Sequence, residues 1–135
     1  MRGDFFDTNV VLYLLDDSPK ADIAERLLRG GGTISVQVLN ETLVNCLRRA
    51  AMSHAEAGAF LSGIRAVCEV TDLTQRVHDI GRAVAERYRL SVYDSMIVGA
   101  ALVAGCTRLW SEDMQDGMVI EGSVTISNPF AAPAG

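Results

Sequence analysis

Short apolar runs alternate along the chain with longer segments whose apolar residues recur every three or four positions. A short apolar run predicts a buried strand, and the longer spacing predicts a helix with one apolar face. Strands are expected at residues 5–6, 33–36, 68–73, 107–110 and 124–126. Helices or helical turns are expected at residues 10–15, 21–29, 38–49, 53–67, 74–88 and 96–104. Because the two kinds of element alternate, we expect an α/β protein, a three-layer α/β/α sandwich around a mainly parallel sheet.

The length of 135 residues fits one domain, so residues 1–135 are expected to form a single unit with a frayed tail at residues 131–135. Apolar residues make up 49% of the chain, which excludes a disordered protein. The longest apolar run, residues 96–106, is well short of the ~20 residues of a membrane-spanning helix. No signal peptide is expected, because Asp4 and Asp7 interrupt the one candidate segment.

The cysteines and histidines offer little chemistry. Cys46, Cys68 and Cys106 are widely spaced and form no C-x-x-C pair, so we expect buried thiols in a reducing cytoplasm. His54 and His78 lie far from each other and from the cysteines. The sequence therefore offers few of the residues that a zinc enzyme or a histidine-based acyl-transfer triad requires.

The net charge is −5, and of the 12 basic residues Lys20 is the single lysine. A protein that binds nucleic acid through its overall charge would carry a net positive charge, so this chain is not expected to bind nucleic acid in that way. If five carboxylates gather at one metal site, however, the rest of the chain is neutral. Arginine patches could then still approach a polyanion.

Four acidic residues fall where a strand ends or a helix begins. Asp7 follows the first predicted strand, and Glu41 is expected in the first turn of the helix after the second. Asp94 is expected just before the apolar helix at residues 96–104, and Asp113 follows the strand at 107–110. Strand C-termini and helix N-termini share one edge of a parallel sheet, so the pattern permits four acids at one rim. Each acid alone could instead cap a helix, complement a helix dipole or form a turn.

If the four acids do meet, their charges need a counterion. Two carboxylates ~4 Å apart repel by about 4 kcal/mol at an effective dielectric of 20, and no lysine is near in sequence. A divalent cation is the natural answer, and oxygen ligands select Mg²⁺ or Mn²⁺ rather than zinc. Carboxylate-bound Mg²⁺ with retained waters is typical of phosphate chemistry.

Four ordered motifs resemble those of one nuclease family. They are FFDTNVVLYL at residues 5–14, VQVLNE at 36–41, YDSMIVGAAL at 93–102 and WSEDMQDG at 110–117; NPF at 128–130 resembles the family's closing strand. The chain is similar throughout to PIN-domain ribonucleases, above all to VapC-type toxins of bacterial toxin–antitoxin pairs.

The resemblance implies an α/β/α PIN fold and Mg²⁺- or Mn²⁺-dependent cleavage of RNA. It implies neutralisation by a VapB-type antitoxin, and a homodimer within a larger toxin–antitoxin complex in the cytoplasm. The residues it implicates are the catalytic and metal-binding acids Asp7, Glu41, Asp94 and Asp113, an accessory metal ligand Asp116, and the supporting residues Thr8, Asn9 and Ser111.

Other functions stay open at this point. A PIN fold could serve only as an RNA- or protein-binding module, without catalysis. A phosphoacceptor receiver domain has a similar size and acidity, but it needs a late lysine, and Lys20 is early. Two arginine pairs are candidates for the RNA-binding surface, Arg48 with Arg49 and Arg87 with Arg89. Neither the RNA target nor the choice between Asp113 and Asp116 as the closer ligand follows from the sequence.

Overall fold

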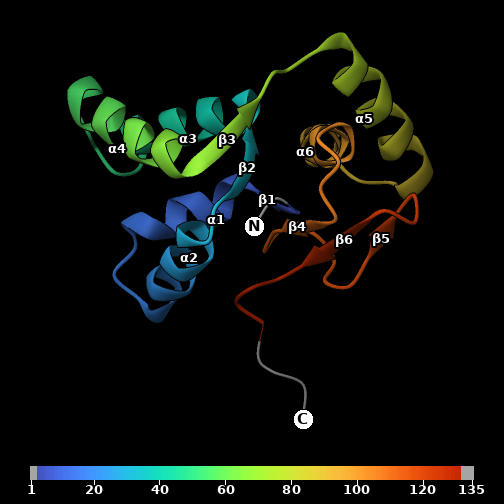
Figure 1. The fold of residues 1–135 in the computed structure, drawn as a ribbon. Helices are drawn as coiled ribbons and strands as arrows, with labels where there is room; N and C mark the ends of the chain where they lie inside the picture. The colour runs from blue at the N-terminus through green and yellow to red at the C-terminus, as the bar shows by residue number, and fades with distance from the viewer. Residues whose placement is uncertain (1–2, 132–135) are drawn as a thin grey trace.

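Six short strands between residues 3 and 131, the part of the chain that the computed structural model describes, form one sheet (Figure 1). Their order along the sheet is β3-β2-β1-β4-β6-β5, and every neighbouring pair except β5–β6 is parallel. The strands are β1 (Asp4–Phe6), β2 (Gly32–Ser35), β3 (Cys68–Thr71), β4 (Arg108–Trp110), β5 (Val119–Ile120) and β6 (Val124–Ser127). Most of the expected frayed tail, residues 132–135, lies outside the described residues.

Helices cover both faces of the sheet. They are α1 (Thr8–Leu12), the 3₁₀ turn η1 (Tyr13–Leu15), α2 (Pro19–Arg29), α3 (Val36–Arg48), α4 (His54–Val67), α5 (Gln75–Tyr88) and α6 (Val92–Val103). Parallel strands are joined by right-handed crossovers, so the direction of each step decides which face its helices cover. The chain moves from β1 to β2 and β3 in one direction along the sheet, and the connection from β3 to β4 runs in the opposite direction. As a result, α1 to α4 lie on one face of the sheet and α5 and α6 lie on the other (Figure 1). The predicted three-layer sandwich is confirmed.

The order of the strands reverses between β1 and β4. The chain moves outward from β1 to β2 and β3, then returns to place β4 on the other side of β1. Phe6 at the end of β1 pairs with Trp110 at the end of β4, and the Asp7 N–H donates to the Trp110 carbonyl at 3.0 Å. A reversal of this kind leaves a crevice beyond the carboxyl ends of the two central strands, which is where open α/β sheets bind ligands.

Serine caps start two helices earlier than the hydrophobic pattern indicated. The Ser35 hydroxyl accepts a hydrogen bond from the Val38 N–H, so α3 begins at Val36, which was expected to end a strand. Glu41 therefore lies in the second turn of α3, not in the first. The Ser91 hydroxyl caps α6 in the same way, and Asp94 is in the first turn of that helix rather than before it.

The C-terminal part of the sheet differs from the prediction. β5 was not foreseen, because a strand of two residues carries no readable alternation; it pairs antiparallel with β6 through a tight turn. Residues 128–130 do not form the expected closing strand. The Asn128 N–H donates to Asp116 Oδ1 at 2.8 Å, and the Asn128 side chain then accepts from the Phe130 N–H at 2.9 Å. The chain thus turns away from the sheet after β6.

A close helix contact fixes the position of α6. Gly81 on α5 faces Gly99 on α6, and a Cβ at Gly99 would lie 3.0 Å from the Gly81 nitrogen and from the Val77 carbonyl oxygen. The two backbones therefore approach as closely as glycine allows, which packs the middle of α6 directly against α5. All three cysteines are free and buried. No helix in residues 3–131 is long and apolar enough to cross a bilayer.

Candidate active site

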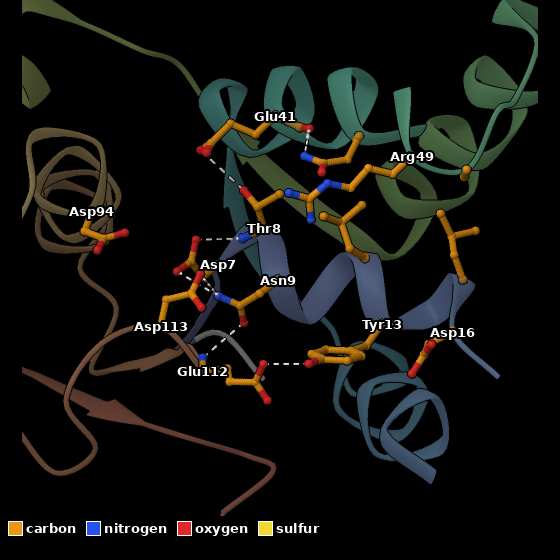
Figure 2. Close-up of a pocket in the computed structure, with 14 residues that line it drawn as sticks. Asp7, Thr8, Asn9, Tyr13, Asp16, Glu41, Arg49, Asp94, Glu112 and Asp113 are labelled. Atoms are coloured by element: carbon orange, nitrogen blue, oxygen red, sulfur yellow. Dashed lines mark hydrogen bonds between the residues drawn. The ribbon is translucent and has the colours of Figure 1, made fainter. Parts of the chain in front are cut away.

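A pocket of about 690 Å³ opens beyond the carboxyl ends of β1 and β4 (Figure 2). Four of its lining residues are the acids singled out in the sequence, Asp7, Glu41, Asp94 and Asp113. They come from four separate segments: the end of β1, helix α3, the start of α6 and the loop after β4. The structure therefore brings together side chains that are up to 106 residues apart in the chain.

Asp7 is the buried member of the group, with only 4% of its surface exposed. Its carboxylate accepts hydrogen bonds from the Thr8 N–H at 2.7 Å and from the Ser111 hydroxyl at 2.7 Å. Burial raises the pKa of Asp7 from 3.8 to about 6, and the charges of Asp94 and Asp113 add to that rise. The two hydrogen bonds oppose the shift but do not cancel it. Asp7 therefore carries its negative charge at neutral pH in surroundings that disfavour it.

Asn9 links Asp7 to the loop after β4. Its side-chain nitrogen lies 3.2 Å from Asp7 Oδ2 and 3.2 Å from Asp113 Oδ2, and it donates toward both carboxylates. Its side-chain oxygen accepts the Glu112 N–H at 3.1 Å. Ser111 completes the connection, because its hydroxyl also accepts the Asp113 N–H at 3.2 Å. One amide side chain thus holds Asp113, which is exposed, beside Asp7, which is buried.

Glu41 faces the pocket from α3 and is held by two neighbours. The Thr8 hydroxyl lies 3.4 Å from Glu41 Oε1, and the side-chain nitrogen of Gln37 donates to the same oxygen at 3.1 Å. Gln37 lies one helical turn before Glu41, so both project from the same face of α3. It also donates to the Tyr93 carbonyl at 3.1 Å, which ties α3 to the start of α6.

Asp94 enters the pocket from the first turn of α6. Its pKa is raised, first by partial burial and then by the charge of Asp113, while a hydrogen bond with Ser91 acts in the opposite direction. In Figure 2 its carboxylate points toward Asp7 and Asp113 across the pocket. Two of the four acids thus have raised pKa values, and like-charge repulsion contributes to both.

A second cluster holds the outer edge of the same loop. The Tyr13 hydroxyl donates to Glu112 Oε1 at 2.6 Å, and the Lys20 ammonium donates to Glu112 Oε2 at 2.7 Å. These hydrogen bonds, that from Lys20 first, lower the pKa of Glu112. The Lys20 nitrogen also lies 4.8 Å from the centre of the Tyr13 ring and 5.4 Å from that of Phe130. The cluster joins η1, α2 and the loop that carries Asp113.

Some candidates lie outside the pocket. Asp116 is on the loop of Asp113 but does not line the pocket, and its carboxylate accepts the Asn128 N–H instead. Arg87 is paired with Glu121 at 3.1 Å, away from the acids. Arg49 lines the pocket, while its neighbour Arg48 does not.

The sequence reasoning assigned no role to Glu112 or Gln37. For Gln37 a signal existed, since a polar residue four positions before Glu41 shares its helix face. For Glu112 the sequence offers none, because its partner Lys20 is 92 residues away.

The donor set suits a hard divalent cation. All four acids offer carboxylate oxygens, which Mg²⁺ and Mn²⁺ prefer, and the pKa of Asp7 is raised mainly by burial, with a further contribution from the charges of Asp94 and Asp113. Within residues 3–131, no three histidine, cysteine or acidic side chains are close enough to enclose a metal ion. Any bound cation would be held by few carboxylates, with water as its remaining ligands, which is how proteins usually bind Mg²⁺.

Fold and site together define an α/β protein with an acidic pocket at the switch point of a parallel sheet. Within that class, residues 5–115 match the PIN domain, and the chain belongs to the PIN-domain family. The resemblance seen in the sequence motifs is therefore confirmed. Membership of the PIN-domain family also excludes a phosphoacceptor receiver domain. No curated protein matches the chain in sequence.

Solved structures with the same fold include several toxin–antitoxin proteins. A toxin–antitoxin complex from Klebsiella pneumoniae has a TM-score of 0.74 at 17% identity, over 96% of this chain and 99% of that one. DNA-bound VapBC from Salmonella typhimurium has a TM-score of 0.71 at 22% identity, over the same shares of the two chains. VapC20 of Mycobacterium tuberculosis, a sarcin–ricin loop cleaving toxin, has a TM-score of 0.64 at 22% identity, over 78% of this chain and 86% of that one. At these identities the similarity establishes the fold.

Proposed function

We propose that the protein is a divalent-metal-dependent endoribonuclease and the toxin of a toxin–antitoxin pair. The observation that carries the proposal is the single pocket that Asp7, Glu41, Asp94 and Asp113 all line. Membership of the PIN-domain family and the fold shared with VapC20 support it. The reaction would hydrolyse an RNA phosphodiester by in-line attack of water, with no covalent bond to the protein.

Each residue of the site would have a distinct role in the reaction. The carboxylates of Asp7, Glu41, Asp94 and Asp113 would supply the few protein ligands of Mg²⁺ or Mn²⁺, with water as the remaining ligands, and the ion would supply an activated water and neutralise charge at phosphorus when bound. Ser111 would keep Asp7 ionised and oriented through its 2.7 Å hydrogen bond. Thr8 would orient Asp7 and Glu41, and Asn9 would hold Asp113 beside Asp7. We do not place Asp116 at the metal, because it accepts a backbone N–H elsewhere.

The assembly is part of the same proposal. The toxin–antitoxin structures that share this fold support a VapB-type antitoxin as partner. We further propose one domain over residues 1–135, a homodimer within a larger toxin–antitoxin complex, and a location in the cytoplasm.

Cleavage of RNA by the purified protein tests the proposal directly. A long natural single-stranded RNA is incubated with wild type and with Asp7→Asn or Asp94→Asn, in Mn²⁺ and in EDTA. Wild type should cleave the RNA in Mn²⁺ only, and both variants should lose cleavage while keeping their circular dichroism spectra. Asp79→Asn is the matched control, because Asp79 is exposed on α5. Full cleavage by Asp7→Asn or Asp94→Asn would refute the assignment.

A binding module without catalysis is the remaining alternative. In this alternative, the PIN fold and its acidic pocket would bind RNA or a protein without cleaving RNA. Calorimetric titration with Mn²⁺ separates the two functions. An enzyme of the proposed kind binds Mn²⁺ and loses that binding in Asp7→Asn, whereas a protein that binds RNA but no Mn²⁺ is a module.

A further inference from the structure

Among residues 3–131, Arg49 is the one basic residue that lines the acidic pocket. Six of the lining residues in that part of the chain are acids: Asp7, Asp16, Glu41, Asp94, Glu112 and Asp113. A polyanion entering such a pocket is repelled by uncompensated carboxylates. A cation is therefore needed to hold the backbone of an RNA there, in addition to any ion at the four central acids.

The Arg49 side chain makes no ion pair with these acids. The ion pairs among the described residues join Lys20 to Glu112, Arg29 to Glu25 and Arg87 to Glu121. Lys20, which does not itself line the pocket, is thus engaged by Glu112, while Arg49 forms none of the ion pairs found among the described residues and its guanidinium donors can bind a ligand. A guanidinium has five N–H donors in a planar fork that matches two oxygens of a phosphate.

The position of Arg49 suits a phosphate beside the reacting one. It follows the last residue of α3, and Figure 2 shows its side chain directed back into the pocket toward Thr8. In the same view Asp94 and Asp113 lie on the opposite side of the pocket. We infer that Arg49 binds a phosphate of the RNA backbone at the α3 end of the pocket, and so holds the strand across the four acids. The inference rests on the proposed function, because RNA is its ligand.

Arg48 provides a matched control. It is exposed and shares the C-terminal end of α3 with Arg49, so both interact similarly with the helix dipole and with solvent. Arg48 does not line the pocket. A role in general charge or in helix stability would therefore appear in both variants, and a role in binding a phosphate would appear in Arg49 alone.

Steady-state cleavage of a fluorescent fragment of the long RNA tests the inference. Arg49→Ala should raise KM about tenfold with kcat little changed, because the contact is made equally in the ground and transition states. Arg49→Lys should recover part of the loss, since it keeps the charge without the fork. The slope of log KM against log salt should flatten by about 0.7 in Arg49→Ala, the value for one contact to a single strand. Arg48→Ala should resemble wild type.

Three results would overturn the inference: unchanged KM in Arg49→Ala, equal effects of Arg48→Ala and Arg49→Ala, or a fall in kcat at constant KM. Fluorescence anisotropy with the same RNA in EDTA measures binding without cleavage. It therefore distinguishes failure of the Arg49 inference from failure of the proposed nuclease function. If wild type binds the RNA, Arg49→Ala binds it about tenfold more weakly and Mn²⁺ produces no cleavage, the inference stands and the nuclease function is refuted. If wild type does not bind the RNA, the inference is overturned.

Discussion

Replacing Asp7 by asparagine should make the protein more stable while removing its activity. Burial raises the pKa of Asp7 from 3.8 to about 6, a difference of about two units. Each unit corresponds to about 1.4 kcal/mol, so keeping Asp7 ionised in the folded protein costs about 3 kcal/mol at pH 7. An amide carries no charge and escapes this cost. It recovers less than the full amount, because its NH₂ group cannot accept the hydrogen bond from Ser111.

The sign of the pH dependence follows from the direction of the shift. Below pH 3.8 Asp7 is protonated in both states, and its contribution is at its most favourable. Between pH 3.8 and about 6 the unfolded chain loses the proton first, so the free energy of unfolding falls as pH rises. Above pH 6 the contribution is constant. The advantage of Asp7→Asn over wild type should therefore grow from about pH 4 to pH 6 and level off at about 1–3 kcal/mol.

Urea denaturation in EDTA measures this difference, with the fluorescence of Trp110, the single tryptophan, as the signal. Comparing wild type with Asp7→Asn at each pH cancels the titration of the carboxylates that do not interact with Asp7, which leaves only the smaller effects of Asp94 and Asp113. Asp79→Asn, on the exposed face of α5, should stay within about 0.5 kcal/mol of wild type. A variant that is less stable than wild type at pH 7, or an advantage that does not vary with pH, would contradict the burial argument.

Three further perturbations test the rest of the site. Mn²⁺ at about 100 times its Kd should raise the free energy of unfolding of wild type by about 2.7 kcal/mol and leave Asp7→Asn unchanged; equal shifts in both would place the ion elsewhere. Glu112→Gln removes the charge that Lys20 pairs with at 2.7 Å, and should lower kcat while costing under about 1 kcal/mol of stability, since the pair is partly exposed. An unchanged kcat would mean that this pair does not position the loop. Gly99→Ala should cost about 1–3 kcal/mol in urea denaturation, because its Cβ meets the α5 backbone, whereas Gly63→Ala in open space should not destabilise α4.

The gathering of acids in one pocket could be anticipated from the sequence, for a topological reason. Asp7 and Asp113 each follow a short apolar run, and the ends of parallel strands share one edge of a sheet. The capping box of Ser53 and Glu56 is likewise a local signal, and the structure contains it. Features of this kind depend on neighbours in sequence, or on a rule that applies to every parallel sheet.

The contacts that shape the pocket could not be anticipated in the same way. Asn9 bridges Asp7 and Asp113, and its sequence neighbourhood indicates only a helix start. The pairing of Lys20 with Glu112 depends on how α2 packs near the loop after β4, and no periodicity encodes that. The early starts of α3 and α6 had a readable cause in Ser35 and Ser91, but apolar residues such as Val36 fit a strand and a helix equally well.

The pairing of β1 with β4 has a consequence for when this protein first becomes able to act. Asp7 is synthesised more than 100 residues before Ser111 and Asp113, which complete its surroundings. No partial chain ending before β4 contains the assembled pocket. For a protein whose proposed activity destroys RNA, we expect this order to leave the nascent chain inactive on the ribosome until β4 and the loop after it have been synthesised.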